Sequence, residues 1–103
     1  AGATAMIRIF CAYPNLLMQQ FPELKRLHRE RRIAIASFDT HRGYIMPDDQ
    51  VVMISPRAVM HTQITKPSHL HDYSRLGSYA HAHCKHVAYI LSFPLHVPAA
   101  PQE

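Results

Sequence analysis

Residues 33–38 read Ile-Ala-Ile-Ala-Ser-Phe, and the rest of the chain can be placed relative to this stretch. Both alternating sets of positions are apolar, which is typical of a strand that other elements cover on both faces. The sequence therefore predicts either a central strand of a sheet or a strand that lies beneath a helix.

The segment before this strand is expected to be helical. Asn15 can cap a helical turn at residues 16–20, and Pro22 suits the start of a second helical segment that runs to about residue 32. Apolar residues recur there at helical spacing and form one stripe, which consists of Leu17, Phe21, Leu24 and either Leu27 or His28. The two segments are expected to be separate helices or one kinked helix.

The beginning of the chain supplies another strand candidate. Between Met6 and Tyr13, one set of alternating positions carries Ile7, Ile9 and Cys11, and Pro14 ends the pattern. Together with the helical segments and residues 33–38, this pattern predicts an opening β-α-β unit.

Shorter strand candidates follow, separated by turn residues. Residues 44–46 and 51–54 flank Pro47-Asp48-Asp49, which predicts a hairpin turn. Residues 59–65 predict a weaker strand, and prolines on both sides favour a place at the edge of the sheet.

The last third of the chain holds one helix candidate and one strand candidate. Ser68 can cap a short helix at residues 69–76, and Gly77 stands just beyond its end. Residues 79–86 fit both a strand and a helix, so periodicity leaves both open. The β-branched and aromatic content of residues 87–93 favours a final strand.

These elements predict a single α+β domain over residues 6–96, with a mixed or antiparallel sheet of about four to six strands and one main helix. Residues 1–5 are expected to be a remnant before a natural start at Met6, and residues 97–103 a frayed tail. The apolar runs fall short of the roughly 18 residues that cross a bilayer, and no signal-peptide pattern opens the chain. We therefore expect a cytoplasmic protein without membrane contact, whose two cysteines stay reduced.

Positive charge is concentrated in one part of the chain. The net charge is +4 with neutral histidines, and five of the eleven lysines and arginines fall within eight positions: Lys25, Arg26, Arg29, Arg31 and Arg32. Cations in this pattern can contact nucleic-acid phosphates or an acidic protein. The alternative is an amphipathic helix with a solvated outer face and no partner.

Histidines are concentrated in another part. Five of the nine histidines lie between residues 69 and 86. On a strand, His81 and His83 would point the same way, and His86 could add a third ligand, which predicts a site for zinc or another divalent transition metal. The alternative is a set of surface histidines beside an inward-facing Cys84.

His69-Leu70-His71 resembles the His-hydrophobic-His signature of the nickases called HUH endonucleases. The resemblance implies a divalent metal held by a histidine pair on a strand and a tyrosine that attacks a DNA phosphate. In this chain, Tyr73 or Tyr79 would be that nucleophile.

From these patterns we expect a small basic binding or regulatory protein rather than an enzyme, and we assign no catalytic residue. Its partner is expected to be nucleic acid or an acidic protein. A metal-dependent nuclease or nickase that uses the histidines is one alternative. Another is a structural protein that forms a homo-oligomer, such as a homodimer, through an edge strand at residues 59–65 or 87–93.

Overall fold

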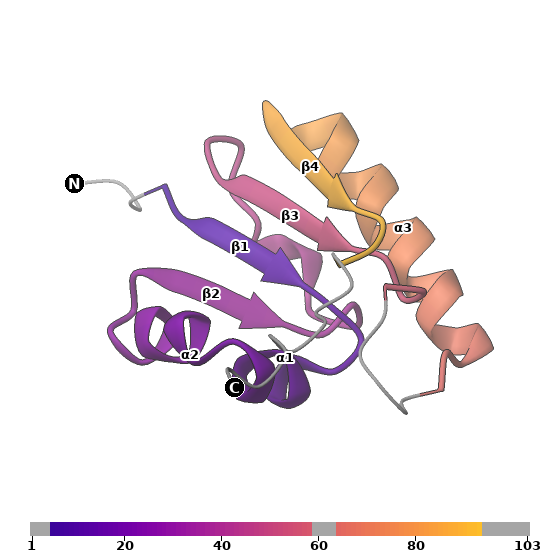
Figure 1. Ribbon diagram of the computed structural model, residues 1–103. Helices are drawn as coiled ribbons and strands as arrows, with labels where there is room; N and C mark the ends of the chain where they lie inside the picture. Colours follow the sequence, from indigo (N-terminus) through magenta and orange to yellow (C-terminus); the bar gives the residue numbers. More distant parts are fainter. Residues whose placement is uncertain (1–4, 59–63, 94–103) are drawn as a thin grey trace, which may run out of the picture.

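The computed structural model describes residues 5–58 and 64–93 (Figure 1). In chain order, its elements are β1 (Ile7–Phe10), α1 (Pro14–Gln20), α2 (Pro22–Arg29), β2 (Ile33–Ala36), the 3-10 turn η1 (Arg42–Tyr44), β3 (Gln50–Ile54), α3 (Pro67–His83) and β4 (His86–Ile90). The opening β-α-β unit is thus confirmed, with two short helices between its strands. Three ranges lie outside the described residues: 1–4, 59–63 and 94–103. They include most of the strand expected at residues 59–65.

The four strands form one sheet in the order β2-β1-β3-β4, and all three strand pairs are parallel. The expected mixed or antiparallel sheet is therefore wrong. The turn at residues 46–49 does form, because the Asp49 N–H donates to the Met46 carbonyl at 3.0 Å. It is entered from η1 instead of from a strand, however, and β3 then pairs with β1.

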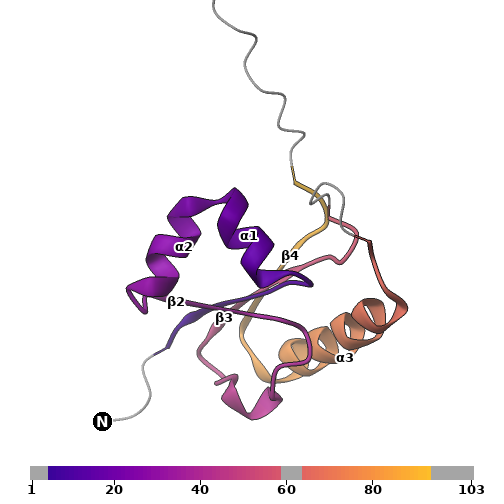
Figure 2. The ribbon, with the colours of Figure 1, turned by 90° about the horizontal axis from the view of Figure 1, so that it is seen from below.

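Helices cover both faces of the sheet. Figure 2 shows α1 and α2 on one face and α3 with the β2–β3 connection on the other. The chain moves from β1 to β2 in one direction across the sheet, and then through β3 to β4 in the opposite direction. Because parallel crossovers are nearly always right-handed, this reversal moves the connection to the opposite face. Strands covered on both faces are apolar at both sets of positions, as residues 33–36 are.

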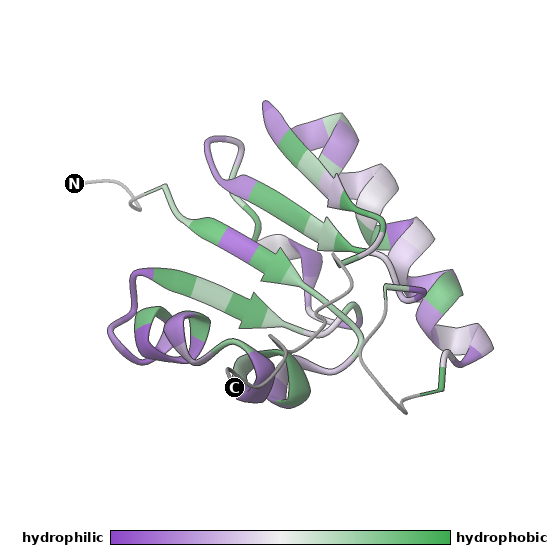
Figure 3. Cartoon of the chain, viewed as in Figure 1, coloured by the Kyte–Doolittle hydropathy of each residue, from purple (hydrophilic) through white to green (hydrophobic). Residues whose placement is uncertain are grey.

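Two apolar clusters form the core, one on each face of the sheet. The cluster under α1 and α2 is centred on Ile9, Leu17 and Ile35. The cluster under α3 joins Phe10 and Met53 of the sheet to buried residues of the β2–β3 connection and α3, namely Phe38, Ile45, Leu76 and Ala80. Figure 3 shows the apolar strands between more polar outer helix surfaces.

The main helix is longer than the sequence predicts. It does not end before Gly77 but continues to His83, so most of residues 79–86 are helical. Gly77 is buried, and a Cβ there would lie 3.6 Å from the Tyr89 hydroxyl, an ordinary contact distance. Leu76 and Ala80 are also buried, so packing on the sheet outweighs the weak helix propensity of one glycine.

The final strand is shorter than expected and lies at an edge. β4 pairs with β3 alone among the described strands, and Tyr89 is 46% exposed. The edge position expected for residues 87–93 is thus confirmed for β4, whereas association through this edge stays a prediction. None of the described helices has the length and apolarity that a membrane crossing requires.

A buried carboxylate joins the N-terminal ends of β1 and β3. Asp49 is fully buried and accepts hydrogen bonds from the Met6 N–H at 2.9 Å, the Met46 N–H at 2.8 Å and the Arg8 Nε at 2.5 Å. Burial by itself raises the pKa of Asp49, but the hydrogen bonds from Met46, Arg8 and Met6 outweigh it, and the net pKa is lowered. We call Asp49 and Arg8 the Asp49–Arg8 pair.

Candidate anion-binding surfaces

The lysine and arginines of α2 and of the turn after it divide into one paired arginine and four unpaired side chains. Arg26 bonds to Glu30 at 2.8 Å and also to Glu23. These bonds raise the pKa of Arg26, and its hydrogen bond to Glu23 lowers the pKa of that carboxyl. Among the residues that the structure describes, the other four are exposed and form no ion pair: Lys25, Arg29, Arg31 and Arg32. We call these four residues the α2 cationic surface.

The turn that ends α2 places two of these arginines. The Arg31 N–H donates to the His28 carbonyl and the Arg32 N–H to the Leu27 carbonyl, both at 3.0 Å, which is the Schellman pattern of helix ends. Arg31 occupies the left-handed position of this motif with φ 60°, where glycine is the usual residue. The sequence therefore carries no glycine signal for this turn, because an arginine occupies the position where glycine is usual.

The structure does not bring the predicted metal ligands together. His81 and His83 lie on α3, not on a strand, and residues two apart on a helix point in different directions, while His86 lies on β4. His83 instead contacts the Tyr79 ring, with 4.3 Å between ring centroids. Within the described ranges, no group of three or more His, Cys, Asp or Glu side chains could hold a metal ion.

The pair that resembles the HUH signature is also helical. His69 and His71 lie in the first half of α3, so the strand placement that the resemblance implies is not met. His69 Nδ1 accepts a hydrogen bond from the Lys66 N–H at 3.2 Å, and its ring contacts Tyr13 at 5.1 Å between centroids. Its observed contacts therefore stabilise the start of α3.

Both cysteines are free thiols held in the structure by packing. Cys11 is buried between the sheet and α1, and burial raises its pKa to about 12. Cys84 is half-buried, its Sγ lies 3.5 Å from the Met46 carbonyl, and burial raises its pKa as well. A raised pKa disfavours the reactive thiolate, so neither thiol is activated as a nucleophile.

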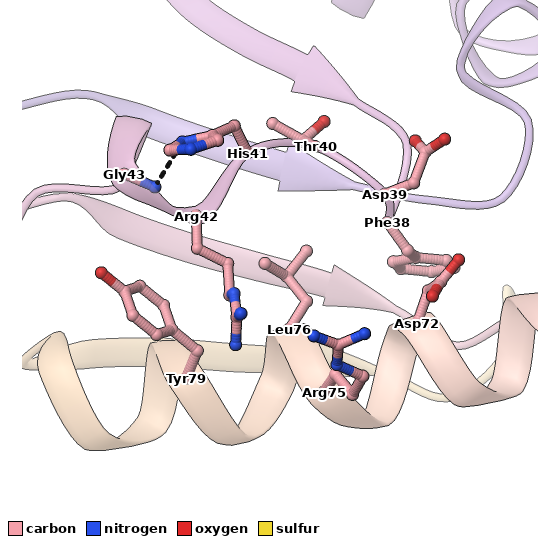
Figure 4. A pocket seen from close by; sticks show the side chains of 10 residues that line it. All are labelled: Phe38, Asp39, Thr40, His41, Arg42, Gly43, Asp72, Arg75, Leu76 and Tyr79. Carbon is pink, nitrogen blue, oxygen red and sulfur yellow. Dashed lines mark hydrogen bonds between the residues drawn. The ribbon is translucent and has the colours of Figure 1, made fainter.

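A groove of about 620 Å³ lies between the β2–β3 connection and α3 (Figure 4). It combines two arginines, two aspartates and several hydrogen-bonding side chains. Its lining consists of Phe38, Asp39, Thr40, His41, Arg42, Gly43, Asp72, Arg75, Leu76 and Tyr79. Sequence reasoning missed this site, since its two sides are about thirty residues apart in the chain and neither side carries a recognisable motif.

Local hydrogen bonds shape the connection side of the groove. Thr40 Oγ1 donates to the Ser37 carbonyl at 2.8 Å, and the Gly43 N–H donates to His41 Nδ1 at 3.0 Å. A Cβ on Gly43 would lie 2.8 Å from His41 Cε1, so any other residue here would displace the His41 ring from its present position. The bond between His41 and Gly43 spans Arg42 and holds it at the start of η1.

Comparisons with known proteins assign no family to this chain. It significantly matches no protein-family model, no curated protein and no solved structure. The case for function therefore rests on the α2 cationic surface and on the groove.

Proposed function

We propose that the protein binds nucleic acid through the α2 cationic surface, by contacts to the phosphate backbone. The observation that carries this proposal is that Lys25, Arg29, Arg31 and Arg32 are exposed and unpaired in the described part of the chain, whereas Arg26 is already neutralised. Contacts from such residues to phosphates give affinity without sequence discrimination.

The backbone at Arg31 supports this proposal. A residue with a side chain in the left-handed region costs about 1 kcal/mol relative to glycine. Arg31 adopts that conformation at an exposed position, where its side chain forms no ion pair with a described residue. The turn that ends α2 sets this conformation, and glycine would adopt it at lower cost, so a role for the Arg31 side chain in binding would account for the arginine.

Binding assays at several salt concentrations test the proposal. With a labelled DNA duplex of about 20 base pairs, four phosphate contacts predict a slope of log K against log salt near −3.5. The double variant Arg29→Gln/Arg32→Gln should bind more weakly and reduce the steepness of the slope by about two. Arg57→Gln removes one charge from an exposed loop outside this surface, so it is the matched control for each single variant, Arg29→Gln and Arg32→Gln, and should change the slope less than either.

Two results would contradict the proposal. One is a slope that stays unchanged in the double variant. The other is a lack of duplex binding at low salt together with binding to polyglutamate, which would identify an acidic protein as the partner instead.

A further inference from the structure

The groove between the β2–β3 connection and α3 has the chemistry of a small-molecule site. We propose that it binds a phosphate ester that also carries hydroxyl groups, with the phosphate between Arg42 and Arg75 and a hydroxyl at Asp72. The two segments that line the groove, the β2–β3 connection and α3, lie on the face of the sheet opposite α2 (Figure 2). The proposal therefore does not depend on nucleic-acid binding at the α2 cationic surface.

The two arginines converge from separate elements. Figure 4 shows Arg42 extending from η1 toward α3 and Arg75 extending from α3 into the groove, on either side of Leu76. Within the described residues, neither arginine forms an ion pair with a carboxylate. Both arginines line the groove and are exposed, so their planar donors are available to phosphate oxygens of a ligand there.

Tyr79 orients Arg42 without neutralising it. The Arg42 guanidinium carbon lies 5.5 Å from the centroid of the Tyr79 ring. Such a cation–π contact favours one position of the side chain while its full positive charge remains available to a ligand. Arg42 is thus held in place for an anion before the anion arrives.

The other end of the groove calls for a different group. Asp72 lies there beside Phe38 (Figure 4), and its carboxylate would repel a phosphate but accept a hydrogen bond from a hydroxyl. A volume of about 620 Å³ is also far larger than a lone phosphate needs and falls in the range of small-molecule sites. A phosphorylated polyol or sugar satisfies both ends.

An NMR titration of the full chain with inorganic phosphate tests the arginine end. We expect saturable shifts of the backbone amides at residues 40–43 and 75–79, with a dissociation constant on the order of millimolar. Arg42→Gln and Arg75→Gln should each raise that constant about tenfold or more, while Arg57→Gln should leave it unchanged. Shifts that do not saturate, or that persist unchanged in both variants, would overturn the proposal.

A second titration tests the aspartate end. Ribose 5-phosphate should bind about tenfold more tightly than inorganic phosphate, through hydrogen bonds from its hydroxyls. In Asp72→Ala, which removes the acceptor, this gain should be lost, whereas inorganic phosphate should bind equally or more tightly because a nearby negative charge is gone. An ester that binds no better than phosphate, or a variant that weakens both ligands equally, would overturn the assignment.

The same spectra separate the two proposals. Amides at residues 25–32 report on the α2 cationic surface, and amides at residues 40–43 report on the groove. Loss of duplex binding in Arg29→Gln/Arg32→Gln with unchanged groove shifts would support the two sites as independent. Groove shifts that disappear in that double variant would overturn the groove as a separate site.

Discussion

The β2–β3 connection carries two charged residues in opposite environments. Near its middle, Arg42 is exposed and forms no ion pair within the described chain. At its end, Asp49 is fully buried and bonded to Arg8 and to two backbone N–H groups. A buried charge must be paired because its desolvation is otherwise uncompensated, whereas an exposed charge needs no partner. The difference separates charges that hold the fold together from charges that are available to ligands.

The same distinction applies within α2. Arg26 and Arg29 belong to one helix, yet Arg26 is paired with two glutamates and Arg29 is not paired with any described residue. The number of cations in a segment therefore overstates its capacity to bind anions.

Removal of the buried carboxylate should have the largest effect. Asp49→Ala leaves Arg8 and two backbone donors without an acceptor, and we expect the free energy of unfolding to fall by about 3–5 kcal/mol. Urea denaturation measures this loss. Asp48→Ala is the matched control, because Asp48 is exposed and pairs only with exposed Lys85, so its loss should stay below about 1 kcal/mol. Equal losses in the two variants would remove the distinction between buried and exposed charges.

Acid should also weaken the Asp49–Arg8 pair, but it should lower the free energy of unfolding by less than Asp49→Ala does. The pKa of Asp49 is lower in the folded protein than in the unfolded chain, so its contribution is complete above the ordinary aspartate pKa of about 3.9. That contribution is lost as the pH falls from there through the lowered folded pKa. Unfolding free energies measured from about pH 6 to pH 3 should therefore decline less steeply in Asp49→Asn than in the wild type. Parallel declines would show that Asp49 does not titrate in this way.

Replacement of the strained arginine should raise stability and reduce binding. Arg31→Gly relieves the left-handed backbone and should increase the free energy of unfolding by about 0.5–1 kcal/mol. The same variant removes one cation, so its duplex affinity should become less dependent on salt. Arg32→Gly, one residue later and outside the left-handed region, should lose affinity without gaining stability. A stabilised variant with unchanged binding would leave Arg31 without a role in recognition.

The arginines of the groove should have the smallest effect on stability. Because Arg42 and Arg75 are exposed and unpaired in the described chain, we expect Arg42→Gln and Arg75→Gln to change the free energy of unfolding by less than about 0.5 kcal/mol. Thermal unfolding without phosphate tests this expectation. A loss of several kcal/mol would show that these arginines stabilise the fold, as Arg8 does.

Local patterns predicted the elements of the fold better than their arrangement. The alternation in residues 33–38 predicted β2, and Pro22 predicted the start of α2, where it is the first residue. The expected cap of the first helix, Asn15, is wrong, because α1 already begins at Pro14. The Met46–Asp49 turn forms as predicted, but it does not lead into a hairpin. A turn signal in the sequence is local, so it does not show whether the next strand pairs with the segment just before it or with a distant one. Strand pairing depends on which face each connection covers, and that is a property of the whole sheet.

The candidate binding residues were predictable where they are close in sequence. The α2 cationic surface follows from the charge density of residues 25–32, but the pairing of Arg26 with Glu23 and Glu30 requires their side-chain positions. The groove depends on the packing of the β2–β3 connection against α3, which brings Arg42 and Arg75 to one space. The histidine hypothesis assumed a strand, and helical geometry separates the ligands that it needs.

The order of the strands also bears on synthesis and folding. β1 is the first strand of the chain, but it lies inside the sheet, and one of its partners begins at Gln50. The bond between Met6 and Asp49 spans 43 residues, so β1 cannot complete its pairing until β3 has left the ribosome. Contacts of such long sequence separation slow folding. Until then β1 has β2 as its only available neighbour among the described strands, and α1 and α2 are the elements already made that can cover it.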